Sequence, residues 1–209
     1  RKAYARAAEA GDAHGRAEYG RCLLRGIGGA ADVARGQAEL ARLLFHELAH
    51  QQAYARDDSA FNESYATAVE QLGLCAWWAA HPDPVAQQQD RERERRRSVW
   101  RERALALRAD LQRLYAGSGV DKRAAKTERL RAFVAEMEAL AAQDAGYSGY
   151  LPWARGANNA SLALLSTYRS QVAAFEALFE RLRGDWPNFH REVARLAALP
   201  RDQRNRELL

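Results

Sequence analysis

Apolar residues recur every three or four positions along most of this chain, which is the spacing of amphipathic helices. Gly11, the turn at 26–29, HPDP at 81–84 and Gly184 interrupt the pattern. The helices that it predicts cover residues 1–12, 13–25, about 32–56, Asn62 or Glu63 to Ala80, both limbs of 86–143, about 160–183, and 186–198, with a short polar tail from Pro200. No stretch alternates convincingly as a strand would, so the predicted fold class is all-α.

Residues 86–143 are predicted to form a long antiparallel helical arm. The first limb has an apolar seam at alternating spacings of four and three, which suits a helical hairpin. GSGVD at 117–121 is the turn, and the return limb has a similar spacing. The seam residues are Trp100, Ala104, Leu107, Leu111 and Leu114, facing Leu130, Phe133 or Val134, Met137, and Leu140 or Ala141.

The segment at 144–161, DAGYSGYLPWARGANNAS, is predicted to be irregular because it is rich in glycine, aromatic residues and asparagine. Long irregular segments inside compact domains are often functional. Functional side chains are therefore expected in this segment as well as on the helices.

The N-terminal stretch at 7–40 resembles a SEL-type repeat, a relative of the tetratricopeptide repeat. The resemblance rests on AAEAGDAHGRAEYG, the GIGG turn and the DVARGQAEL that follows. One such repeat does not bury its own apolar face, since about three are needed for stability. We therefore divide the chain into a repeat-like segment, 1–40, and a second region, 41–209, and expect the first to pack on the second or on further repeats.

Composition narrows the function classes. The chain has 209 residues, 47% of them apolar and 28% charged, as in an ordinary globular protein. The net charge is +5, and the basic run RERERRR at 91–97 lacks the interleaved aromatic residues of a nucleic-acid surface, so no nucleic-acid partner is expected. No apolar run is long enough to span a membrane. Two cysteines, Cys22 and Cys75, provide neither a disulfide framework nor a zinc ribbon.

The stretch FHELAHQ at 45–51 contains the HExxH pattern on a predicted helix. Residues four apart share a helix face, so His46 and His50 can bind one metal ion, and Glu47 can act as the general base. A catalytic zinc site needs a third protein ligand and an open fourth position. The alternative is a helix that carries two histidines by coincidence.

A longer segment, LLFHELAHQQAYARDDSAFNESYATAVEQLG at 43–73, resembles a bacterial family of putative aminopeptidases. The resemblance continues through WARGANNASLALLSTYRSQVAAFEALFE and GDWPNFHREVARLAALP, and covers about 41–209. It implies a gluzincin, a zinc peptidase whose third ligand is a glutamate on the next helix. The implied zinc ligands are His46, His50 and Glu63, with Glu47 as the base toward a metal-activated water and a peptide as the substrate.

Further roles are predicted around these residues. Glu70 lies two turns after Glu63 and is a candidate acceptor for the outer N–H of a ligand histidine, with Asp58 and Asn62 as alternatives. Tyr150, Tyr168 and His190 are candidate donors to the oxyanion, although the family pattern has a tyrosine where His190 stands, and each has the alternative role of a packed aromatic or a surface histidine. Asn158 and Asn159 are candidates for binding the substrate backbone or for capping the next helix.

The chain departs from the family pattern before the motif. The resemblance implies a sizeable upstream segment with strands, whereas this chain has repeat-like helices there. Two hypotheses follow: a zinc-dependent peptidase, with aminopeptidase specificity resting on the family description alone, or a helical module that binds a protein partner through its N-terminal helices and has a vestigial or structural zinc site. The family resemblance favours the cell envelope or periplasm, with the cytoplasm as the alternative.

Overall fold

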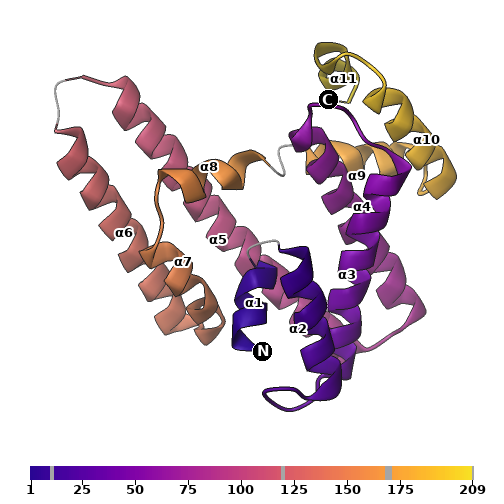
Figure 1. Cartoon of the computed structure of the whole chain (residues 1–209), viewed down its shortest axis with the longest axis horizontal. Helices are drawn as coiled ribbons and strands as arrows, with labels where there is room; N and C mark the ends of the chain where they lie inside the picture. The colour runs from indigo at the N-terminus through magenta and orange to yellow at the C-terminus, as the bar shows by residue number, and fades with distance from the viewer. Residues whose placement is uncertain (10–11, 119–120, 168–170, 209) are drawn as a thin grey trace. The chain divides into compact units, whose positions relative to one another are not determined.

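A computed structural model describes residues 1–9, 12–118, 121–167 and 171–208 (Figure 1). Among these residues the regular elements are all helical and no strand is found, which confirms the predicted all-α fold. The elements are α1 Lys2–Glu9, α2 Ala13–Arg25, α3 Val33–Gln52, α4 Ser59–Ala80, α5 Pro84–Ala116, α6 Lys122–Gln143, the 3₁₀ helix η1 Ala145–Tyr150, α7 Leu151–Arg155, α8 Asn159–Thr167, α9 Val172–Arg181, α10 Trp186–Ala197 and α11 Arg201–Leu208. None of the described helices is long and apolar enough to cross a membrane.

The chain divides into two compact units. The first consists of Arg1–Gln87 and Thr167–Leu209, and the second of Gln88–Ser166. The boundary predicted between residues 40 and 41 falls inside α3, so the repeat-like segment and the motif share one continuous helix.

Aspartate caps set the helix starts in the first unit. Asp32 accepts a hydrogen bond from Arg35 N at 3.1 Å, so α3 starts at Val33, as predicted. Asp58 likewise accepts from Phe61 N at 3.2 Å. α4 therefore begins at Ser59, about one turn earlier than predicted, because the cap is Asp58.

The main core of the first unit surrounds α4. Phe61 and Tyr65 are completely buried, and both rings contact Phe175 of α9, with centroids 5.0 and 5.6 Å apart. Phe189 and Val193 of α10 belong to the same core. This core fixes α4, which carries Glu63 and Glu70, between α3 and the C-terminal helices.

The prediction of a short polar tail after Pro200 is wrong. These residues form the helix α11, in which Arg204 and Leu208 are buried. Arg204 is 4% exposed and pairs with the buried carboxylate of Asp58, while its guanidinium also donates to the carbonyls of Leu196 and Leu199. Arg204 of the last helix, α11, thus fixes the N-terminus of α4.

The second unit is built on the predicted helical arm. α5 and α6 form an antiparallel pair (Figure 1), and the predicted seam residues of α5 are buried in one cluster with Phe133 and Met137 of α6. The segment predicted to be irregular contains η1 and α7, which pack on this pair. Tyr150 stacks on Trp100, with ring centroids 5.2 Å apart, and Trp153 meets the same indole edge-on. The aromatic residues of this segment thus serve the core of the second unit.

Candidate metal centre

α3 places two imidazole rings one helical turn apart. His46 and His50 lie on the same side of the helix, with ring centroids 5.0 Å apart and planes at 82°. Their side chains are 18% and 20% exposed. Both imidazole rings are therefore mostly buried but still partly exposed to solvent.

α4 brings a carboxylate to the same place. Glu63 Oε2 lies 3.4 Å from His46 Nε2, and Glu63 Oε1 lies 3.7 Å from His50 Nε2. All three ligand atoms can be chosen within 4.8 Å of one another. In a tetrahedral zinc site with bonds of about 2.0–2.1 Å, neighbouring ligand atoms lie about 3.4 Å apart. The spacing of the three side chains is therefore compatible with a zinc ion, and their chemistry, two imidazoles and a carboxylate, suits zinc.

The connection between α3 and α4 is held by side-chain hydrogen bonds. The Asn62 amide accepts from Ala55 N at 2.8 Å and donates to Ala55 O at 2.9 Å. Asp58 caps α4 and pairs with Arg204. Asn62 and Asp58, two of the predicted orienting residues, thus bond to the loop backbone and to α11 and not to the histidines, and they help to fix the start of α4, which carries Glu63.

Glu70 lies beneath the cluster. It is 1% exposed, and its Oε2 lies 3.4 Å from His46 Nδ1. Burial lowers the pKa of His46, but the carboxylates of Glu63 and Glu70 outweigh burial and raise that pKa to about 9. Of the three predicted orienting residues, Glu70 is the one whose carboxylate faces a ring nitrogen of the cluster.

Two arginines donate hydrogen bonds to Glu70, and neither was predicted from the sequence. Arg16 Nη1 donates to Glu70 Oε2 at 3.0 Å, and Arg42 Nη1 donates to Glu70 Oε1 at 3.4 Å. Arg42 precedes His46 by one helical turn, so its position on the same face of α3 was a usable signal. Arg16 is 54 positions from Glu70 and gave no local signal.

Glu47 is exposed and adjoins the first histidine on α3. Successive helical residues are rotated by about 100°, so the side chain of Glu47 points to one side of the helix face that carries the two histidines. The predicted base is thus a solvent-exposed residue adjacent to His46 in the sequence.

The putative aminopeptidase family matches residues 30–208, which is most of the chain. The chain belongs to this family. The match begins just before α3 and ends in α11, so it includes both histidines, both glutamates and Arg204, whereas α1 and α2 precede it. No curated protein and no solved structure matches the chain.

In this member of the family, His190 is not brought into the cluster. Its Nδ1 is hydrogen-bonded to the Tyr65 hydroxyl, and its ring stacks on Trp186 with centroids 5.6 Å apart. Tyr65 follows Glu63 by two positions, so the two side chains leave α4 on opposite sides. Burial lowers the pKa of His190 and raises that of Tyr65.

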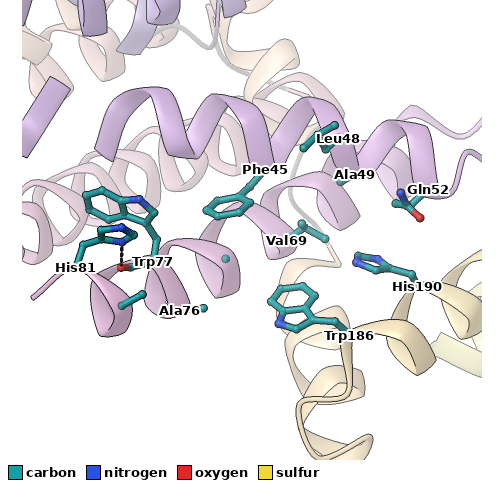
Figure 2. Close-up of a pocket in the computed structure, with 12 residues that line it drawn as sticks. Phe45, Leu48, Ala49, Gln52, Val69, Ala76, Trp77, His81, Trp186 and His190 are labelled. Carbon is teal, nitrogen blue, oxygen red and sulfur yellow. Dashed lines mark hydrogen bonds between the residues drawn. The ribbon is translucent and has the colours of Figure 1, made fainter. Parts of the chain in front are cut away.

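His190 instead lines an apolar cavity of about 410 Å³ (Figure 2). Figure 2 shows Phe45 and Leu48 of α3, Trp77 of α4, and Trp186 of α10 around it. The described residues that line this cavity do not include the three cluster residues, so the cavity and the cluster use different faces of α3 and α4.

The remaining predicted site residues lie elsewhere in the aminopeptidase-family chain. Tyr150 is packed in the core of the second unit. Asn158 caps α8, because its Oδ1 accepts from Ala160 N at 2.9 Å and Ser161 N at 3.1 Å. Asn159 donates to the hydroxyl of Tyr115 at 3.1 Å. Tyr168 lies outside the described residues.

Proposed function

We propose that this chain is a zinc-dependent peptidase whose metal is held by His46, His50 and Glu63. The observation that carries the proposal is the Glu63 carboxylate, which lies 3.4 and 3.7 Å from the Nε2 atoms of the two histidines. Two histidines and a glutamate with an open fourth position are a donor set that zinc peptidases use. Membership of the putative aminopeptidase family makes a peptide the expected substrate.

A zinc ion at this position would lower the pKa of a water molecule to about 7 and polarise a peptide carbonyl. Glu47 would accept the proton from this water and pass it to the leaving amine. Its place on α3, directly after His46 and open to solvent, gives it access to the open side of the cluster.

The other residues around the cluster hold the ligands in place. Glu70 Oε2 lies 3.4 Å from His46 Nδ1, a position from which it would orient the ring so that Nε2 faces the metal. Asn62 fixes the loop before α4, and Asp58 caps the first turn of α4. Together they fix the start of the helix that carries Glu63. The burial of this framework keeps the ligand geometry fixed before the metal binds.

The test is to measure peptide hydrolysis with a mixed peptide library and to detect new amino termini by mass spectrometry. Glu47→Gln should lower the rate by about 10²–10⁴-fold while one zinc remains bound, because it removes the base and no ligand. Glu128→Gln, at an exposed position of α6, is the matched control and should retain full activity. Hydrolysis that survives Glu47→Gln would refute the assigned base.

A further inference from the structure

Arg16 connects the N-terminal helices to the metal centre. It lies on α2, ahead of the segment that the putative aminopeptidase family matches. Its guanidinium donates to Glu70 Oε2 at 3.0 Å, and the same oxygen lies 3.4 Å from His46 Nδ1. One carboxylate oxygen therefore joins a residue outside the family match to a residue of the cluster.

The contact is buried, which makes its charge balance important. The side chain of Arg16 is 11% exposed and that of Glu70 is 2% exposed. A buried carboxylate is strongly disfavoured unless cations and hydrogen bonds compensate it. Arg16 and Arg42 supply two guanidinium groups, one on each oxygen of Glu70.

The position of the Glu70 carboxylate affects the orientation of the His46 ring, because Oε2 lies 3.4 Å from Nδ1. An ionised carboxylate only accepts hydrogen bonds, so the facing Nδ1 has to carry the proton. Nε2, on the other side of the ring, is then available to bind a metal beside Glu63. Without the hydrogen bond from Arg16, Glu70 loses the donor that holds its Oε2 beside His46 Nδ1, so the imidazole ring is oriented less firmly.

Close packing fixes α2, and hence Arg16, against α3. A Cβ atom at Gly36 would lie 2.8 Å from the Leu24 side chain and 3.0 Å from the carbonyl oxygen of Gly20. Only glycine allows this approach of the two backbones. Arg16 lies one turn before this crossing on α2, so its position relative to α3 is set by backbone contact.

We propose that Arg16 is a positioning residue of the metal centre: through Glu70 it orients His46, so the helices before the family segment form part of the site. This inference rests on the proposed zinc function. It assigns α2 a role in metal binding that the repeat-like pattern of its sequence did not indicate.

The test is the zinc affinity of the full chain, measured by competition with a chromophoric chelator. Arg16→Met should weaken zinc binding by about tenfold, the lower end of the 10–100-fold loss typical of outer partners of metal ligands. Arg16→Lys keeps the cation and should retain most of the affinity. Arg21→Met is the matched control, because Arg21 is an exposed arginine on the same helix that pairs with Glu18.

Two further readouts separate positioning from a general loss of stability. The visible absorption bands of the cobalt(II) form should shift in Arg16→Met and stay unchanged in Arg21→Met, because they report on ligand geometry. In a Glu70→Gln background, Arg16→Met should cause little further loss of zinc affinity, since both changes interrupt the same connection. Arg16→Gln, which removes the guanidinium but keeps a polar side chain, is the second variant if Arg16→Met does not fold, and the same loss is expected.

The outcomes are distinct. Wild-type protein that binds zinc, with Arg16→Met or Arg16→Gln binding it equally tightly, would overturn the role of Arg16 and leave the proposed function intact. An Arg16→Met loss that is equally large in the Glu70→Gln background would overturn the route through Glu70. Wild-type protein that binds no zinc would overturn both the inference and the proposed function.

Discussion

Arg204→Met should destabilise the first unit strongly, although the residue lies in a helix of polar sequence. The substitution removes a buried cation from Asp58, whose side chain is 3% exposed, and deletes donors to the carbonyls of Leu196 and Leu199. Leaving one partner of a buried ion pair uncompensated costs about 3–5 kcal/mol. Asp58 retains the backbone N–H of Phe61 and has Arg201 at 3.9 Å, so we expect a loss near the lower end, about 3 kcal/mol.

The assay is urea unfolding of the metal-free protein, followed by circular dichroism. Arg206→Met, at an exposed position of the same helix, is the control and should change the free energy of unfolding by less than about 0.5 kcal/mol. Adding Asp58→Asn should recover part of the loss, because a neutral amide needs no cation and still caps α4. If Arg204→Met is as stable as Arg206→Met, α11 does not anchor the first unit in the way described.

The remaining predictions concern the loop, the metal, the pH response and the arm. Asn62→Ala should cost about 1–3 kcal/mol in the same urea assay, because it leaves the buried N–H and C=O of Ala55 without their partner. Chelation should lower the melting temperature and added zinc should restore it, and at 1,000 times the dissociation constant zinc should contribute about 4 kcal/mol. The NMR titration midpoint of His190 should lie below the ordinary value of histidine, since burial lowers its pKa. The unfolded protein then binds more protons at this residue than the folded protein does. The contribution of His190 to the free energy of unfolding therefore falls as the pH drops below about 6.5. Leu111→Ala should cost about 2–5 kcal/mol, visible as an earlier change in tryptophan fluorescence, because Leu111 is 3% exposed in the seam of α5 and α6.

The sequence was sufficient where the signal was local. The start of α3 followed from Asp32, and the seam of the arm followed from the spacing of its apolar residues. The proximity of His46, His50 and Glu63 followed from helical geometry and from the resemblance of FNES to the family pattern. These inferences need only residues that are close in sequence, and that is why they could be made.

The buried ion pairs that could not be predicted join residues that are far apart in the sequence. Arg204 lies in a run without apolar periodicity, and its burial depends on Asp58, which is 146 positions away. Arg16 looks like any surface arginine on a repeat-like helix until the fold brings it to Glu70. Conversely, the aromatic residues of 144–161 suggested a functional loop, but Tyr150 packs on Trp100.

The zinc content of the purified chain, measured by elemental analysis beside His46→Ala and Glu63→Gln, tests the central claim most directly. The account predicts about one zinc ion per wild-type chain and a clear loss in both variants, since each removes one of three protein ligands. A wild-type chain that takes up no zinc after incubation with the metal, or variants that hold as much zinc as the wild type, would contradict it.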